Sequence, residues 1–172
     1  MSTADSMVNT VSTRTLHRCW FMTLFLAALG LVMGGAHALE LPIRMHYAPE
    51  FYREVTRTQY RYFGLVGGPI QVLALLASVA LCRFVRGGSA FRPTLLGTVL
   101  LGLSLCLWFL LVEPVNAAWS DALRAGPADA VQAYARLRLR WESGHVAAFV
   151  AWLVGFVCLL HGLIQMSVAA EH

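Results

Sequence analysis

Residues 138–145, Arg-Leu-Arg-Trp-Glu-Ser-Gly-His, combine a carboxylate with an imidazole and are the stretch of this chain best suited to chemistry. Glu142 and His145 are three residues apart, so on a helix they project from the same face. About twenty apolar residues follow them without a break. Ionisable groups are costly to bury at the mouth of a membrane helix, so this pair is a candidate for function.

Other polar residues stand at the ends of the remaining apolar runs. Four antiparallel spans would bring the end of the first, the start of the second, the end of the third and the start of the fourth to one side of the membrane. We therefore expect a single polar cluster, in which both histidines lie deeper than both glutamates by about 4.5 Å of helical rise. Its members outside residues 138–145 are His37, Glu40, Tyr60, Arg61, Glu113 and Asn116.

The elements that must position this cluster follow from composition. The chain has 172 residues, of which 58% are hydrophobic and 13% charged, with a mean hydropathy of +0.64. Soluble domains carry about 25% charged residues. Four apolar runs, at about 20–41, 64–84, 94–113 and 142–169, are each long enough to cross roughly 30 Å of hydrocarbon. The sequence predicts an all-α, integral membrane, antiparallel four-helix bundle over residues 16–170, after a disordered tail at 1–15.

Both long loops have features of interfacial helices. Residues 43–62 hold four tyrosines and four arginines, a composition typical of the membrane interface, and Pro49 can open a helix there. In the other long loop, Gly126-Pro127 is a turn signal, and the chain can run helically from Asp129 into the fourth span. Within the spans, Gly67-Gly68-Pro69 signals a local break and Pro114 a kink.

Charge and cysteine usage exclude several classes of partner and site. All thirteen basic residues are arginines in the tail, in the loops or at the ends of the spans, so the net charge of +4 describes membrane flanks and no nucleic-acid surface. The four cysteines have no Cys-x-x-Cys spacing, which favours packing over a zinc site or disulfide framework. Small residues at 27, 28, 30, 34 and 35 would admit a neighbouring helix, including one from a second copy of the chain.

Arginine counts bear on location and orientation. The first apolar run is longer than the core of a typical signal peptide, so we interpret it as a retained span. The raw count, five arginines in the tail and second loop against eight in the long loops, favours long loops in the cytoplasm. The second loop nevertheless holds three arginines and no acid, and some long-loop arginines belong to the candidate site. We expect both termini to be cytoplasmic, in a bacterial inner membrane.

A metal centre is the first interpretation of the cluster. Glu-x-x-His is the spacing used on bundle helices by carboxylate-bridged di-iron and di-manganese proteins. The second span, however, offers Gln71 and tyrosines where another carboxylate is needed. A single iron, copper or manganese ion fits the count better. Its candidate ligands are His37, Glu40, Glu113, Glu142 and His145.

Two other interpretations need no metal. A neutral histidine held by a carboxylate can act as a general base in a dry pocket. Alternatively, the glutamates and histidines pair with nearby arginines and only hold the rim of the bundle together. Trp119, Trp141 and Tyr60 flank the cluster, where they would line a substrate pocket or form an ordinary aromatic belt. Gly144 would let a substrate or a helix approach the backbone, whereas His161 lies about 24 Å along the helix from His145.

Three motifs resemble those of the anthrone-oxygenase-like family of small four-span membrane proteins. They are Gly35 to Glu40 with Pro42, Glu113-Pro114-x-Asn116-x-x-Trp119, and Arg140-Trp141-Glu142-x-Gly144-His145. The resemblance covers nearly the whole chain after residue 15. It implies oxidation of a lipophilic phenolic or polycyclic substrate by molecular oxygen without an organic cofactor: a base removes an acidic C–H proton, and the carbanion reacts with oxygen.

Physical reasoning assigns roles within this chemistry. His145 is the expected base, Glu142 or Glu113 its orienting partner, and Asn116 or Arg140 a donor to the developing oxyanion. The expected function is an oxygen-dependent, monooxygenase-like oxidoreductase acting on a lipophilic aromatic, phenolic or quinone-like molecule from the membrane lipid. The competing class is a non-catalytic membrane protein, an accessory subunit or small-molecule binder, whose polar cluster is a structural lock.

Overall fold

The computed structural model describes residues 12–169, and every element in that range is helical, as the sequence predicts. The α-helices are joined in two places by short π-helical segments, named η1 and η2. In chain order the elements are α1 (Thr13–Arg44), α2 (Pro49–Thr58), η1 (Phe63–Gly67), α3 (Gly68–Phe84), α4 (Phe91–Leu107), η2 (Trp108–Val112), α5 (Glu113–Ala125) and α6 (Pro127–Ala169).

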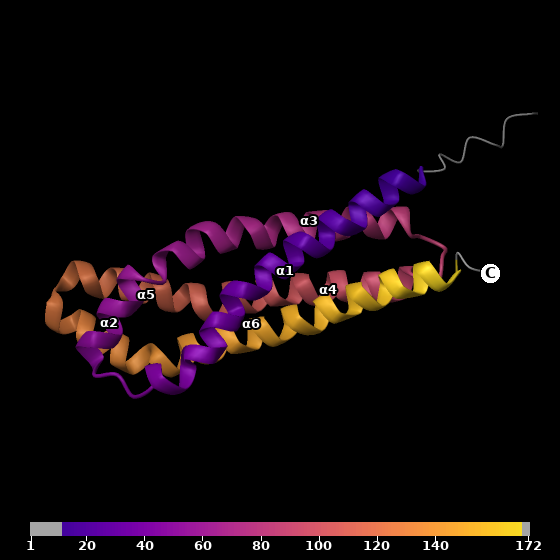
Figure 1. Cartoon of the computed structure of the whole chain (residues 1–172). Coiled ribbons are helices and arrows are strands. Elements are labelled where there is room, and N and C mark those ends of the chain that lie inside the picture. Colours follow the sequence, from indigo (N-terminus) through magenta and orange to yellow (C-terminus); the bar gives the residue numbers. More distant parts are fainter. Residues whose placement is uncertain (1–11, 170–172) are drawn as a thin grey trace, which may run out of the picture.

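Four antiparallel rods make up the bundle (Figure 1). α2, η1 and α3 follow one another along one rod, and α4, η2 and α5 along another. α1 and α4 each pack against α3 and α6. Each rod includes a stretch that is long and apolar enough to cross a membrane. This arrangement confirms the predicted all-α four-helix bundle, with α2 and α5 gathered at one end (Figure 1).

Helix boundaries differ from the expected ones at the first span. α1 begins at Thr13, where the Ser12 hydroxyl accepts a hydrogen bond from the Thr15 amide, so residues 13–15 of the expected tail are helical. Residues 1–11 lie outside the described range. α1 also continues through Pro42 to Arg44. A proline in the last turn removes only one helical hydrogen bond, and the helix accommodates it.

Prolines at the predicted helix starts behave as expected. Pro49 opens α2, and Pro127 opens α6 after Gly126, whose φ of 156° favours glycine. The break signalled at residues 67–69 is the junction of η1 and α3, and Pro114 lies just after η2. α6 then runs unbroken into the fourth span, as the sequence predicts.

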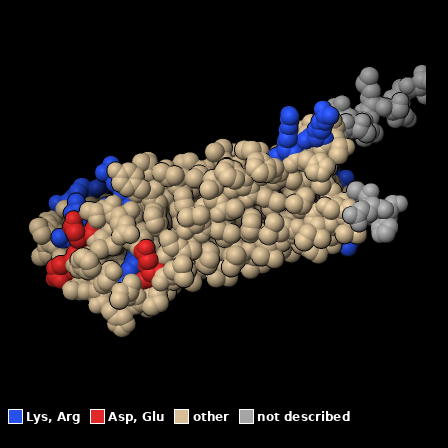
Figure 2. All heavy atoms as spheres, viewed as in Figure 1, with Lys and Arg blue, Asp and Glu red and all other residues tan. Residues whose placement is uncertain are grey.

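Charged side chains lie at the two ends of the visible face and leave its middle uncharged (Figure 2). Within the described range, every acidic residue belongs to the end that holds α2 and α5. Between its charged ends the bundle exposes many large apolar side chains, such as those of Phe25, Leu76 and Val157. This distribution matches a protein whose middle is surrounded by lipid and whose two ends face water.

Small residues of α1 are used within the bundle. A Cβ added at Gly30 would lie 2.6 Å from Trp152, and one at Gly34 would lie 2.8 Å from Phe149, so both glycines admit large side chains of α6. The Trp152 indole donates a 2.9 Å hydrogen bond to the Ala27 carbonyl. The helix that packs against these small residues of α1 is therefore α6. Association with a second copy of the chain stays a prediction.

α4 and α6 approach each other closely at Gly97 and Gly155, where a Cβ on Gly97 would lie 2.8 Å from the Gly155 carbonyl oxygen. Gly97→Ala is expected to destabilise the protein by about 1–3 kcal/mol, because the helices must separate. Gly102→Ala is the matched control, since its Cβ would meet Leu75 at an ordinary 3.9 Å. The control is expected to be neutral or stabilising by up to about 1 kcal/mol. Unfolding by SDS in mixed micelles measures the change in stability of each variant. Equal changes for Gly97→Ala and Gly102→Ala would contradict the close packing of α4 and α6 at Gly97.

Candidate functional site

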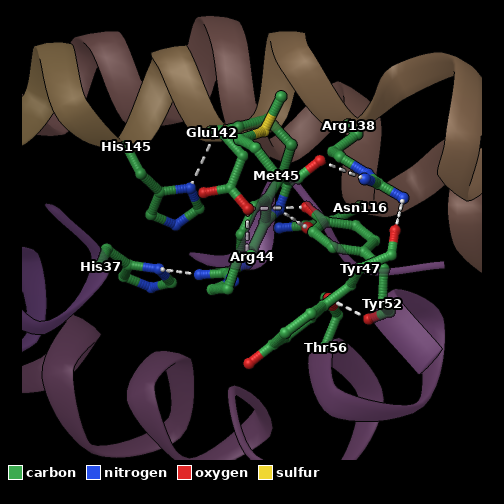
Figure 3. A network of polar contacts seen from close by, with 11 residues as sticks. His37, Arg44, Met45, Tyr47, Tyr52, Thr56, Asn116, Arg138, Glu142 and His145 are labelled. Carbon is green, nitrogen blue, oxygen red and sulfur yellow. Dashed lines mark hydrogen bonds and ion pairs between the residues drawn. The ribbon is translucent and has the colours of Figure 1, made fainter. Parts of the chain in front are cut away.

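Polar residues from α1, α2, α5 and α6 gather at the end of the bundle that holds the short helices (Figure 3). They form two adjoining groups. The first, which we call the ion-pair cluster, consists of Arg44, Tyr52, Arg138 and Glu142. The second, which we call the imidazole pair, consists of His37 and His145.

The centre of the ion-pair cluster is a contact between Arg44 on α1 and Glu142 on α6. Arg44 Nη2 lies 2.6 Å from Glu142 Oε1, and each residue is only 1% exposed. The Tyr52 hydroxyl of α2 donates a 2.9 Å hydrogen bond to the same carboxylate oxygen. The guanidinium also lies over the Tyr60 ring, 4.1 Å from its centroid, at cation–π distance. Three helices are thus joined at one buried carboxylate.

Arg138 joins the turn between α1 and α2 to α6. Its guanidinium donates hydrogen bonds to the carbonyls of Met45 and Tyr47, at 3.1 and 3.0 Å. Carbonyls at and beyond a helix end lack helical partners, and a basic side chain can satisfy them. Arg138 also lies over the Tyr52 ring, 4.3 Å from its centroid. It therefore holds the segment that carries Arg44 and Tyr52 against Glu142.

The imidazole pair is formed between α1 and α6, with ring centroids 4.2 Å apart. His37 is 4% exposed and stacks on Tyr60, at a centroid distance of 4.6 Å. Trp141 contacts both imidazoles, at 5.2 Å from His37 and 4.1 Å from His145. The two rings are therefore fixed inside an aromatic cage.

Hydrogen bonds define which nitrogen of each imidazole carries a proton. Arg44 Nη1 lies 3.1 Å from His37 Nδ1. Because a guanidinium can only donate, His37 Nδ1 accepts, and the proton of this ring is on Nε2. His145 Nδ1 lies 3.0 Å from the Trp141 carbonyl, which can only accept, so this nitrogen donates. In the neutral ring, His145 Nε2 then carries a lone pair. The pair offers one N–H donor and one acceptor.

Both imidazoles line a cavity of about 590 Å³ between the helices. This volume lies within the range of about 300–1,000 Å³ usual for small-molecule sites. The walls are largely apolar, and four of the five tryptophans of the chain contribute to them. Such a lining suits a lipophilic molecule. The aromatic side chains of the lining are Tyr60, Phe63, Trp108, Phe109, Trp119, Tyr134, Trp141, Phe149 and Trp152.

Several of the predicted site residues meet at this cavity. Asn116 connects two of them: its Oδ1 accepts a 2.8 Å hydrogen bond from the Trp141 indole, and its Nδ2 donates to Glu113 at 3.3 Å. Glu113 itself is exposed, and its contact with the site runs through Asn116. The predicted residues that line the cavity are His37, Tyr60, Arg61, Asn116, Trp119, Trp141 and His145.

Other predicted residues lie outside the cavity. Glu142 forms an ion pair with Arg44 and accepts a hydrogen bond from Tyr52. Arg140 is exposed and donates a 3.4 Å hydrogen bond to the Leu110 carbonyl. Gly144 lies where α6 touches η2, since a Cβ there would be 2.9 Å from Val112, so it admits a helix. Glu40, on the last turns of α1, is half-buried.

A metal ligand set is not evident in this geometry. Across residues 12–169, no three His, Cys, Asp or Glu side chains are grouped so that they could hold a metal ion. The Nδ1 atoms of His37 and His145 are both engaged in hydrogen bonds, and Glu142 Oε1 faces a cation. The two Nε2 atoms alone do not make the carboxylate-rich set that the sequence suggests. The iron, copper or manganese site stays a prediction.

Two residues of the ion-pair cluster, Arg44 and Tyr52, escaped the sequence interpretation, and Arg138, within the predicted stretch 138–145, was given no role. A signal for Arg44 was present: it follows His37 by seven residues, or two helical turns, and so lies on the same helical face. Arg138 likewise precedes Glu142 by four residues. Tyr52 gave no comparable signal, because its contact with Glu142 depends on the direction in which α2 leaves the turn after α1.

Comparison of the chain with protein-family models, curated proteins and solved structures gives no match. The likeness of its motifs to the anthrone-oxygenase-like family therefore stays a resemblance between residues.

Proposed function

We propose that the protein is a membrane-embedded, oxygen-dependent oxidoreductase that acts on a lipophilic aromatic, phenolic or quinone-like molecule held in the cavity. One observation carries the proposal: two adjacent imidazoles, one with an N–H donor and one with an acceptor at Nε2, line a largely aromatic cavity of about 590 Å³. Such a site can both take a proton from a bound molecule and donate a hydrogen bond to it.

His145 is suited to act as the base. Its Nδ1–H bond to the Trp141 carbonyl fixes the ring and leaves the Nε2 lone pair for a substrate proton. His37 is suited to donate from Nε2 to a substrate oxygen, because Arg44 occupies its Nδ1. His37 is 4% exposed, and a hydrogen bond donated by a buried group stabilises developing negative charge better than one in bulk water. Asn116, also on the cavity wall, is a further donor.

A balanced reaction needs only substrate and oxygen. His145 removes a proton from an acidic CH₂ group beside an aromatic ring, and the resulting carbanion transfers its electrons to O₂ to form a hydroperoxide. Loss of water from the hydroperoxide leaves a carbonyl, so that R₂CH₂ and O₂ give R₂C=O and H₂O. The carbon loses four electrons and the oxygen molecule gains four. The first proton passes from His145 to the peroxide anion; His145 then takes the second C–H proton and passes it to the departing hydroxide.

The second candidate is a non-catalytic binder or accessory subunit. It is favoured by the ion-pair cluster, in which Glu142 pairs with Arg44 at 2.6 Å and is 1% exposed. A carboxylate so placed stabilises the junction of α1, α2 and α6 and is poorly available for proton transfer to a substrate. Under this alternative the cavity would still bind a lipophilic molecule, and the imidazoles would provide polar contacts.

Oxygen uptake with anthrone as the probe separates the two candidates. Purified protein in phosphatidylcholine nanodiscs is expected to consume one O₂ per anthrone and to release the corresponding quinone. Binding of menadione, measured as quenching of the cavity tryptophans, provides a readout that is independent of turnover. Menadione binding without oxygen uptake from anthrone or from related hydroxyaromatic ketones would favour the binder. Failure of binding and uptake together would overturn the proposal.

A further inference from the structure

Both π-helical segments of the described chain border the same cavity. Phe63, Gly64 and Gly67 of η1 line it on one side, and Trp108 and Phe109 of η2 line it on another. A π-helical turn is rare and is frequently found at functional sites. Two such segments at a single cavity indicate that the helix irregularities shape its wall.

The cavity opens toward lipid between these segments. Val72 of α3 and Phe109 of η2 line the cavity and are nevertheless 45% and 59% exposed, so they stand at its rim. Both lie within the long apolar stretches of their rods. The opposite rim is polar, with the exposed residues Arg61 and Ser120 near the charged end of the bundle. The cavity therefore has a lipid-facing and a water-facing rim.

Gly64 and Gly68 leave the lipid-facing rim unobstructed. A Cβ added at either glycine would meet no neighbouring atom within 4 Å. The two are four residues apart, so they face the same side of the rod, and both line the cavity. Gly67 differs, because its Cβ would lie 3.1 Å from Met33, and its small size serves helix packing. Close contacts between helices therefore do not explain why glycine stands at residues 64 and 68.

An unsatisfied polar group inside the cavity indicates that a ligand belongs there. Tyr60 is 6% exposed and lines the cavity, and its buried hydroxyl has no hydrogen-bond partner among the described residues. Leaving such a group unpaired costs about 1–3 kcal/mol. A bound molecule with an oxygen atom near Tyr60 and the imidazole pair would remove this cost.

We propose that the opening between η1 and η2 is the route by which the ligand of the cavity enters from the bilayer, and that Gly64 and Gly68 set its width. The identity of the ligand as a lipophilic aromatic molecule rests on the proposed function; the opening to lipid does not. Such a molecule is concentrated in the hydrocarbon, and a lateral route spares it transfer through water. Bulky side chains at residues 64 and 68 would obstruct the route without displacing another helix.

The opening to lipid is tested without any ligand. Wild-type protein and the double variant Gly64→Leu/Gly68→Leu are placed in nanodiscs of phosphatidylcholine with brominated acyl chains, which quench tryptophan fluorescence on contact. Trp108 lines the cavity beside the rim, so the wild type is expected to be quenched more strongly than the double variant. Equal quenching of the two would overturn the lateral opening, whatever the protein does chemically.

The route itself is tested by the rate at which menadione quenches the cavity tryptophans in stopped-flow mixing. Gly64→Leu/Gly68→Leu is expected to slow both association and dissociation by about tenfold. Ser120→Leu, at the water-facing rim, is the comparison variant and is expected to slow both rates much less than the double variant does. SDS unfolding verifies that each variant is folded. Slowing by Ser120→Leu alone would overturn the lateral route. If menadione fails to bind the wild type, the proposed function is in doubt, and the brominated-lipid comparison still decides on the opening.

Discussion

Replacing Arg44 with methionine is expected to lower the free energy of unfolding by about 3–5 kcal/mol, the usual cost of removing one partner from a buried ion pair. Arg44 and Glu142 are each 1% exposed, so the remaining carboxylate would be left without its cation and largely out of reach of water. His37 Nδ1 would also lose its donor. Equilibrium unfolding by SDS in mixed micelles provides the measurement.

Two further variants show whether the loss of stability in Arg44→Met arises from the buried ion pair. Arg124→Met breaks an exposed ion pair with Asp121, whose partners are 73% and 72% exposed, and is expected to cost less than about 1 kcal/mol. The double variant Arg44→Met/Glu142→Met removes both buried charges and is expected to recover most of the lost stability, because no unpaired charge remains. A cost for Arg44→Met no larger than that for Arg124→Met would show that the ion-pair cluster does not stabilise the bundle.

His145→Ala is expected to lower kcat for oxidation of an anthrone-type substrate by about 10²–10⁴-fold, the usual contribution of a general base. The substitution removes the Nε2 lone pair on the cavity wall but leaves the buried Arg44–Glu142 contact in place. Menadione affinity is therefore expected to change much less than turnover. Initial rates of oxygen uptake, measured on protein of verified folding, test this expectation.

His161→Ala is the control for the loss of a histidine. His161 lies on the same helix, is exposed, and bonds to Gln165 at the opposite end of the bundle. Its substitution is expected to leave turnover unchanged. An equal loss in both variants would indicate a general effect on α6, and full activity of His145→Ala would remove this residue from the reaction.

Most of the fold follows from the sequence because the bilayer limits the choices. Backbone groups in hydrocarbon must be paired within a segment, so four long apolar runs lead directly to four helices. Topology and depth then explain why His37 and His145 belong together, and their ring centroids are 4.2 Å apart in the structure. The signals at Gly67 and Pro114 predict a break and a kink there, but not π-helical geometry, because glycine and proline mark an irregularity without specifying its hydrogen-bond pattern.

The internal division of the polar site did not follow from residue types. Glu142 and His145 are adjacent on α6 and look like one acid–base unit, yet Glu142 pairs with Arg44 whereas His145 lines the cavity. The division arises because α2 brings Tyr52, and the end of α1 brings Arg44, to the carboxylate. Motif spacing along one helix could not reveal partners that depend on a turn of the chain. The ion-pair cluster thus joins α1, α2 and α6, whereas the imidazole pair is the part of the site to which the proposed chemistry is assigned.

The source of the oxygen atom in the product tests the central claim most directly. Anthrone is incubated with the wild-type protein in nanodiscs under ¹⁸O₂, and the quinone is analysed by mass spectrometry. Oxygenation at the imidazole pair predicts one ¹⁸O atom in each quinone formed and a rate that falls about 10²–10⁴-fold in His145→Ala. A product that carries only ¹⁶O from water, or labelling that is equally fast in His145→Ala, would contradict the account.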